Sequence, residues 1–254
     1  MLDTWVFCCG PVRSGSTLQF NIVREIVEHS NSGQSLKYVY PDQFPEVYDE
    51  FKNSEGIKVF KTHSITPIME KMIRNGEAMG VSCFRDVRDV IVSMHHKSNS
   101  PIHTDSDFSE FTKKYIEYQF FLEELPNLYL SKYEIFYCNI HEEVKSISKF
   151  LQIELSDQLI NKISNELTFS NSQDAVRKAK KEKFIGRNGA EYLIEEKTLL
   201  HSNHFRHIHP GAHGNYLSRK NIRSIEKEAY SWLVQRKYPV SLHSKLLNLF
   251  GLYN

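Results

Sequence analysis

Cysteine is scarce in this 254-residue sequence, which contains only four. Cys8, Cys9 and Cys83 lie within short apolar runs, where cysteine acts as a small buried hydrophobic residue. Together with Cys138 they form neither a disulfide framework nor the ligand pattern of a zinc site. We therefore expect reduced thiols and a reducing, cytoplasmic compartment.

An excess of charge of one sign is also absent. The chain has 32 Lys and Arg residues against 31 Asp and Glu residues, which gives a formal net charge of +1. A nucleic-acid or membrane footprint spread over the whole surface requires a larger positive excess. We therefore expect no nucleic acid and no membrane as partner, and any anion site must be a local concentration of positive groups.

Long hydrophobic runs are missing as well. The first apolar run, Trp5–Cys9, is short and follows no basic leader, so the sequence predicts neither a signal peptide nor a membrane span. Hydrophobic residues at 40% and charged residues at 25% are typical of a soluble globular protein. No repeat or linker divides the chain, and we expect residues 1–254 to form a single domain.

One further absence concerns a single side chain. Residues 10–17 read Gly-Pro-Val-Arg-Ser-Gly-Ser-Thr, close to the nucleoside-triphosphate loop G-x-x-x-x-G-K-[ST]. That pattern needs Lys before its final hydroxyl residue to reach the outer phosphates, but this chain has Ser16 there and carries its positive charge at Arg13. The loop is therefore expected to hold an anionic nucleotide other than ATP or GTP.

The loop lies within an alternation of strand-like and helix-like segments. Apolar residues repeat with helical spacing directly after it, from Thr17 to Glu28. Buried strands are predicted at 5–9, 57–61, 78–84 and 128–132, and further helices at 65–74, 87–97, 142–151, 157–167 and 221–235. This alternation predicts an α/β fold with a central parallel sheet flanked by helices.

A strand, a glycine-bearing loop and a helix together favour an anion site. Main-chain amides at a helix N-terminus and the helix dipole attract a phosphate group, and Arg13 adds a planar fork of positive charge. We therefore assign phosphate contacts to the residues around the start of this helix. They are Ser14, Gly15, Ser16, Thr17 and Leu18.

Two more segments end at the same edge of the predicted sheet. Lys61 and His63 close the strand at 57–61, and residues 85–93 (Arg-Asp-Val-Arg-Asp-Val-Ile-Val-Ser) follow the next strand. Ligands of open parallel sheets bind beyond the carboxyl ends of the strands. Lys61 and His63 are two residues apart on extended chain, so their side chains are expected to point to the same side.

Together these motifs resemble the sulfotransferase family that uses 3′-phosphoadenosine 5′-phosphosulfate (PAPS). Residues 11–17 resemble its 5′-phosphosulfate loop, residues 59–63 (Val-Phe-Lys-Thr-His) its lysine-threonine-histidine strand end, and residues 85–93 its 3′-phosphate motif. Three shorter segments follow in the family's order, namely Tyr133-Glu134, Thr168-Phe169 and Gly211–Tyr216. The resemblance covers most of the chain and implies a sulfotransferase fold similar to that of P-loop NTPases.

The resemblance also implies roles for individual residues. Lys61 and Arg13 would stabilise the phosphosulfate bridge, and His63 would be the general base, because an imidazole has an unperturbed pKa of about 6.5. Arg85 and Ser93 would hold the 3′-phosphate. The remaining donor-binding candidates are Tyr133, Thr168 and Phe169 near the adenine, and His209 and Gly211 in the late motif (206–216). The implied reaction is metal-free transfer of a sulfuryl group from PAPS to a hydroxyl or amine of a small-molecule acceptor, which could be a polar natural product.

The chain departs from the family pattern at two places. The first loop of the family commonly carries Lys where this chain has Arg13. The mobile ammonium group of Lys is thereby replaced by a rigid, planar guanidinium group. The late motif usually has an Arg-Lys pair before its first glycine, where this chain has His209 and Pro210. Because Pro offers neither charge nor an N–H group, the alternative partners for the 3′-phosphate are Arg206, His207, His209 or the basic run at 177–187.

Rival interpretations rest on fewer features. A P-loop nucleotide kinase or NTPase shares the fold and the shape of the loop, but it needs the lysine that is missing at position 16. Five histidines between residues 201 and 213 suggest a metal site, although no cysteine lies nearby. The basic run at 177–187 suggests a nucleic-acid module, or else a solvated loop or helix face, and no base-stacking motif accompanies it.

The acceptor and the assembly are less constrained. Aromatic residues between the first helix and the strand at 57–61 could line an acceptor pocket or pack as core. They are Tyr38, Tyr40, Phe44, Tyr48 and Phe51. Near the C-terminus, Leu242, Leu246, Leu249 and Phe250 share one face of an amphipathic stretch. We expect that face to pack on the domain or on a sister subunit, which would make the protein a homodimer.

Overall fold

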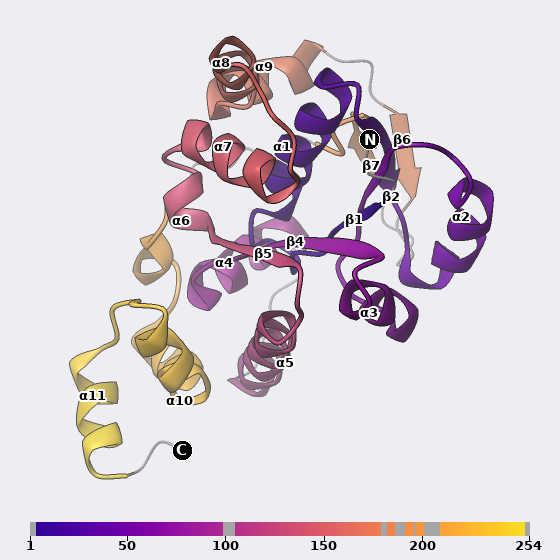
Figure 1. The fold of residues 1–254 in the computed structure, drawn as a ribbon. Helices are drawn as coiled ribbons and strands as arrows, with labels where there is room; N and C mark the ends of the chain where they lie inside the picture. The colour runs from indigo at the N-terminus through magenta and orange to yellow at the C-terminus, as the bar shows by residue number, and fades with distance from the viewer. Residues whose placement is uncertain are drawn as a thin grey trace. The chain divides into compact units, whose positions relative to one another are not determined.

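The computed structural model describes residues 4–98, 105–178, 182–185, 191–195, 197–200 and 209–251. The chain forms two compact units, each built from two stretches of sequence (Figure 1). Unit 1 comprises residues 1–84 and 125–206, and unit 2 comprises residues 85–124 and 207–254. The expected single domain over residues 1–254 stays a prediction.

Unit 1 is built around a five-stranded parallel sheet of order β2-β3-β1-β4-β5. The strands are β1 (Trp5–Cys8), β2 (Gly33–Tyr38), β3 (Ile57–Lys61), β4 (Ala78–Phe84) and β5 (Leu128–Lys132). The central strand β1 pairs with β3 on one side and β4 on the other. Because the strand order reverses at β1, its carboxyl end is the switch point where open α/β sheets bind ligands.

Helices flank this sheet. They are α1 (Ser16–His29), α2 (Phe44–Phe51), α3 (Pro67–Arg74), α6 (Tyr133–Phe136), α7 (Ile140–Phe150), α8 (Asp157–Glu166) and α9 (Phe169–Lys178). In Figure 1, α1 and α7 lie on one side of β4 and β5, and α3 lies on the other side. The 3₁₀ turn η1 (Pro41–Gln43) precedes α2, and β6 (Glu182–Ile185) and β7 (Glu191–Ile194) form a separate antiparallel pair.

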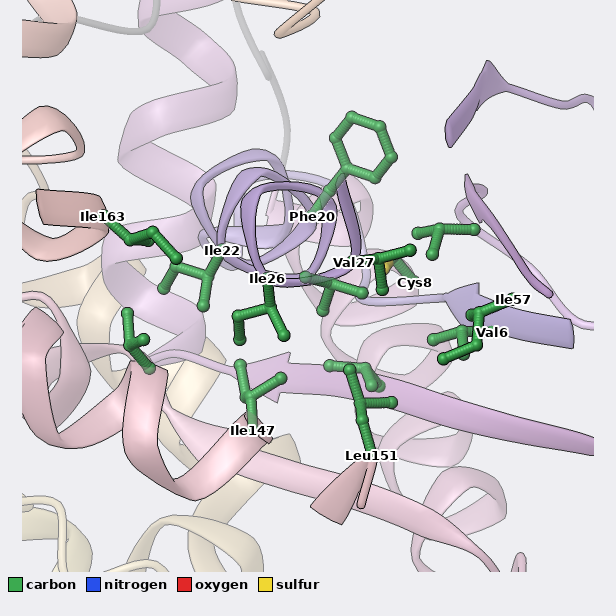
Figure 2. Close-up of a cluster of buried hydrophobic side chains, with 14 of the residues drawn as sticks. Val6, Cys8, Phe20, Ile22, Ile26, Val27, Ile57, Ile147, Leu151 and Ile163 are labelled. Carbon is green, nitrogen blue, oxygen red and sulfur yellow. The ribbon is translucent and has the colours of Figure 1, made fainter. Parts of the chain in front are cut away.

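Alternating side chains of β1 build two different layers of core. Val6 and Cys8 face α1, whose Ile22 and Ile26 pack in turn against Ile147 of α7, as Figure 2 shows. The intervening residues face the opposite layer, in which Phe44 of α2 and Phe60 of β3 contact the rings of Trp5 and Phe7. Full burial of one such side chain contributes about 1.5–3 kcal/mol. The two layers therefore fix β1, and with it the loop that follows β1.

Unit 2 contains α4 (Val87–Ser98), α5 (Asp105–Glu123), the 3₁₀ turn η3 (Ala212–Asn215), α10 (Arg219–Gln235) and α11 (Leu242–Leu249). A buried charge network joins three of these helices. The Arg88 guanidinium lies 2.7 Å from both Asp86 Oδ2 and Glu226 Oε1. Glu226 also accepts hydrogen bonds of 2.6 Å from the hydroxyl groups of Ser241 and Ser244, at the start of α11. A single guanidinium thus pairs with two carboxylates, and the hydroxyl groups stabilise the remaining negative charge.

The predicted α/β class, with a central parallel sheet flanked by helices, is confirmed. Three of the four predicted strands have the observed bounds, and β1 ends one residue earlier than expected. The sequence patterns did not predict β2, α2 or α5. The edge strand β2 is rich in polar residues, and α5 carries many aromatic residues of low helix propensity, so that its packing against α10 decides its conformation.

Other expectations have mixed outcomes. The four cysteines are thiols, and Cys8, Cys9 and Cys83 are buried as predicted. Burial raises the pKa of Cys9 to about 12. Within the described part of the chain, no helix is long and apolar enough to cross a membrane. The four apolar residues of the C-terminal stretch are all exposed, by 47% to 77%, and the homodimer stays a prediction.

Candidate active site

The loop between β1 and α1 is held by short hydrogen bonds. Ser14 Oγ donates to the main-chain oxygen of Pro11 over 2.7 Å, and the Cys83 thiol donates to the main-chain oxygen of Ser14 over 3.3 Å. Arg13 has φ 61° and Gly15 has φ 99°, both in the left-handed region. The loop therefore makes a tight turn that is fastened to β4 before the helix begins.

Gly15 is required by a close approach as well as by its φ angle. A Cβ atom at this position would lie 2.3 Å from Cδ2 of Tyr133, far inside van der Waals contact. Tyr133 begins α6 directly after β5. The structure thus brings Tyr133, a candidate for the adenine side, against the phosphate loop.

The N-terminus of α1 offers main-chain donors. Gly15 is its N-cap residue, no side chain in the described ranges caps it, and its first turn contains no acidic residue. The first hydrogen bond runs from the amide of Gln19 to the oxygen of Gly15, at 3.1 Å. The amides of residues 16–18 precede this bond and have no partner within the helix. This geometry, with Arg13 in the loop, fits an anionic phosphate or phosphosulfate group.

Lys61 and His63 meet at the carboxyl end of β3. Lys61 Nζ lies 3.0 Å from His63 Nε2, and His63 Nδ1 lies 2.9 Å from the main-chain oxygen of Gly10. A carbonyl oxygen can only accept, so Nδ1 carries the proton and Nε2 keeps its lone pair. The prediction that Lys61 and His63 point to the same side is confirmed, and His63 contacts Gly10, the first residue of the phosphate loop.

The aromatic segment before β3 divides between core and site. Phe44 is fully buried, and Tyr48 stacks on Trp5 at a centroid distance of 5.6 Å. Tyr38, at the end of β2, instead lies beside the catalytic candidates: its ring centroid is 5.1 Å from Lys61 Nζ and 5.6 Å from the imidazole of His63. Tyr40 contacts Tyr38 edge-on at 4.9 Å. Phe44 and Tyr48 therefore pack as core, and the alternative of an acceptor pocket lined by Tyr38 or Tyr40 stays a prediction.

In unit 2, the predicted 3′-phosphate motif forms the start of α4. Arg85 and Ser93 are each 6% exposed. The hydroxyl of Tyr115 on α5 accepts from the amide of Arg85 and donates to its main-chain oxygen, both over 3.0 Å. Ser93 lies one turn after Asp89, on the same face of α4. The backbone of Arg85 is thus fixed by α5.

The late glycine motif also belongs to unit 2, and it is bound to α4 through Asp89. The amide of Gly211 donates to Asp89 Oδ2 over 2.6 Å, and the amide of His213 donates to Asp89 Oδ1 over 3.1 Å. His209, a predicted donor-binding residue, is exposed at the start of this motif. Sequence reasoning gave Asp89 no role, although Asp89 lies in the middle of the motif at 85–93.

The remaining candidates have less definite surroundings. Thr168 precedes α9, and its hydroxyl donates to the main-chain oxygen of Asn165 over 3.0 Å; Phe169 is the first residue of α9. The basic run ends α9 at Lys178 and continues in β6. Several residues of interest lie outside the described part of the chain, namely 179–181, 186–187, His201, His204, Arg206 and His207.

One group of side chains in the described ranges has ligand atoms spaced for a metal ion. Atoms of Glu25, His29 and Glu166 lie within 4.8 Å of one another. Cations of the protein already contact this group: Arg24 pairs with Glu25, and Lys162 Nζ lies 3.0 Å from His29 Nε2. An ion-pair cluster explains these contacts. His213, from the predicted histidine cluster, contacts Asp89 instead.

The fold is that of an α/β protein with a tight, glycine-bearing loop at the switch point of its sheet, and comparisons with known proteins identify the family. The sulfotransferase domain profile matches residues 3–227. The chain therefore belongs to the sulfotransferase family, as its motifs predicted, and it is an enzyme of that family. This assignment favours sulfuryl transfer over the kinase or NTPase interpretation.

Individual relatives have low sequence identity to this chain, but the similarity covers most of its length. The amine sulfotransferase of Oryctolagus cuniculus is 20% identical over 245 residues, which cover 89% of this chain and 78% of that protein. Retinol dehydratase, solved with androsterone and the inactive cofactor PAP, has a TM-score of 0.61 at 20% identity over 92% of this chain and 81% of its own. Mouse sulfotransferase SULT7A1 complexed with PAP has a TM-score of 0.59 at 16% identity over 98% and 88%.

Proposed function

We propose that this protein transfers the sulfuryl group of PAPS to a hydroxyl or amine of a small-molecule acceptor, without a metal. The observation that carries the proposal is the contact of His63 with both Lys61 and the main-chain oxygen of Gly10, at the carboxyl ends of β1 and β3. The PAP complexes of its structural neighbours support the same donor. PAP is adenosine 3′,5′-bisphosphate, the product that remains when PAPS has lost its sulfuryl group.

Positive groups of unit 1 would stabilise the leaving group. Main-chain amides at the start of α1, the hydroxyl groups of residues 14, 16 and 17, and the Arg13 guanidinium would bind the 5′-phosphosulfate. Lys61 would donate to the oxygen that bridges sulfur and phosphorus, where negative charge develops as the bond breaks. The planar guanidinium of Arg13 would keep one fixed contact with the phosphosulfate. The flexible ammonium of Lys61 would move to the bridging oxygen as negative charge develops there.

His63 would remove the acceptor's proton. Its Nδ1 proton is held by Gly10, so the lone pair of Nε2 is the basic site. Nε2 becomes available when the ammonium of Lys61 turns from the imidazole to the bridging oxygen. The acceptor oxygen or nitrogen then attacks sulfur in line, the bond from sulfur to the 5′-phosphate breaks, and the proton passes to Nε2.

Donor selectivity would come from the 3′-phosphate and the adenine. Arg85 and Ser93 are proposed to contact the 3′-phosphate, with Gly211 and His209 of the late motif. Tyr133, Thr168 and Phe169 are proposed for the adenine side. The short distance between the loop and Tyr133 supports this role, since a nucleotide bound to the loop reaches that ring.

The acceptor would approach the side of His63 on which Tyr38 lies. The half-buried rings of Tyr38 and Tyr40 offer an apolar wall beside the imidazole. The curated relative is named an amine sulfotransferase, and retinol dehydratase was solved with retinol and androsterone. A small amine or alcohol is therefore the proposed acceptor. A cytoplasmic location and a homodimer remain part of the proposal, the former supported by the buried thiols.

Nucleotide binding tests this function most directly. Calorimetric titration in EDTA is expected to show binding of PAP and none of ATP, whereas a kinase or NTPase would show the reverse once magnesium is added. An acceptor screen of amines and alcohols with PAPS, followed by mass spectrometry of PAP release, then identifies the substrate class. Failure to bind PAP under these conditions would refute the donor assignment.

A further inference from the structure

Asp89 is buried, and its carboxylate accepts hydrogen bonds from a loop far from it in sequence. Its side chain is 0% exposed, and its partners Gly211 and His213 lie more than 120 positions further along the chain. Besides the two amides of Gly211 and His213, His213 Nδ1 lies 3.0 Å from Asp89 Oδ1. One carboxylate therefore makes three hydrogen bonds to the late glycine motif.

The backbone conformation of this loop allows these bonds to form. Gly211 has φ 84°, in the left-handed region, although a Cβ atom there would meet nothing within 4 Å. Glycine is thus needed for the backbone angle and not for space. That angle lets the amides of Gly211 and His213 point at the same carboxylate.

The electrostatics of Asp89 are balanced within unit 2. Burial alone raises the pKa of a carboxyl group, but the His213 side chain, the amide of Gly211 and the charge of Arg85 outweigh it, so the pKa of Asp89 is lowered. Asp89 is therefore ionised at neutral pH. It stands between Arg85 and the late loop, on the helix face that also carries Ser93.

We propose that Asp89 is a positioning residue which locks the loop at 211–213 onto the start of α4, so that the two segments assigned to the donor's 3′-phosphate act as one rigid element. This proposal rests on the proposed function. It accounts for the absence of an Arg-Lys pair before Gly211: the loop contributes by its fixed backbone, and the positive charge at the 3′-phosphate comes from Arg85.

The test compares two nucleotides that differ only in the 3′-phosphate. Wild-type protein is expected to bind adenosine 3′,5′-bisphosphate more tightly than adenosine 5′-monophosphate in calorimetric titrations. Asn at position 89 cannot accept hydrogen bonds through both of its terminal atoms. Asp89→Asn should therefore weaken binding of the bisphosphate about 10- to 100-fold and leave binding of the monophosphate unchanged.

A matched control removes another buried negative charge of unit 2. Glu226 is 1% exposed and makes no bond to residues 211–213. Glu226→Gln is expected to lower the melting temperature and to keep the wild-type preference for the bisphosphate. Its bonds to Arg88 and Ser241 hold α10 against α4 and against the start of α11.

Two further variants keep the test valid if Asp89→Asn does not fold. His213→Ala removes one of the three bonds and should reduce bisphosphate affinity severalfold, whereas His213→Asn keeps a side-chain donor and should restore it. Equal losses for both nucleotides, or no loss in any variant, would overturn the proposal for Asp89. A wild-type protein that does not prefer the bisphosphate would instead refute the proposed function itself.

Discussion

His63 Nδ1 lies 2.9 Å from the main-chain oxygen of Gly10, the residue where β1 gives way to the phosphate loop. This contact joins the carboxyl ends of two adjacent strands. It fixes the tautomer of His63 and directs Nε2 toward Lys61 Nζ, 3.0 Å away. One backbone carbonyl thereby decides which nitrogen of the imidazole is basic.

Replacing His63 by Ala is expected to reduce kcat by about 100- to 10,000-fold, the usual contribution of a positioned general base. Affinity for PAP should be retained, because the proposed phosphate contacts come from the loop, α1 and the motif at 85–93 and not from His63. Steady-state kinetics and calorimetry measure the two effects separately. His243→Ala, on the exposed surface of α11, serves as the control. Near-normal turnover of the His63 variant would remove this residue from catalysis.

Gly15→Ala is expected to destabilise the protein and to impair donor binding. The variant incurs left-handed backbone strain of about 1–2 kcal/mol and overpacking of about 1–3 kcal/mol against Tyr133. Gly76→Ala is a matched control, since Gly76 has φ 78° but open space around its Cβ position. Urea unfolding of both variants separates the clash from the strain. Equal losses of stability would show that the Tyr133 ring gives way.

Glu226→Ala is expected to lower the free energy of unfolding by about 3–5 kcal/mol, because it leaves the buried charge of Arg88 without one of its partners. The pair of Glu70 with Arg74 provides the comparison, since both side chains are at least one third exposed. Glu70→Ala should cost about 0.5 kcal/mol or less. Urea denaturation measures both variants, and similar small losses would contradict the buried network.

Glu143→Gln is expected to change how stability depends on pH. Burial raises the pKa of Glu143, and hydrogen bonds from Ser131, Tyr129 and Gln19 offset only part of the rise. A raised carboxyl pKa means that this residue's contribution to stability is present below the ordinary value of 4.5 and is lost as pH rises through the folded-state value. The variant should therefore gain stability relative to wild type toward neutral pH.

Thermal unfolding across about pH 4 to pH 8 measures this difference. The neighbouring exposed residue supplies a control, because Glu142→Gln alters the same helix where the side chain is 61% exposed. The stability of that variant should depend on pH in the same way as the stability of wild type. If the stability of the Glu143 variant also had the pH dependence of wild type, burial would not raise the pKa of Glu143.

The sequence by itself determined the α/β class, most of the strands and the order of the donor motifs. Those features depend on neighbouring residues: apolar runs, helical spacing and the two-residue repeat that puts Lys61 and His63 on one side of a strand. It did not reveal β2 or α5, whose conformations depend on pairing and packing with distant elements. The roles of individual donor-binding residues remain predictions that the experiments above test.

Only the tertiary structure decided the polar contacts between distant segments. Nothing local in the sequence indicates that Asp89 binds the loop at 211–213, that Glu226 pairs with Arg88, or that Tyr133 covers Gly15. A buried polar group must find its partner among whatever the packed elements bring near it. The apolar pattern therefore determines which elements pack together, and their packing then determines which polar groups meet.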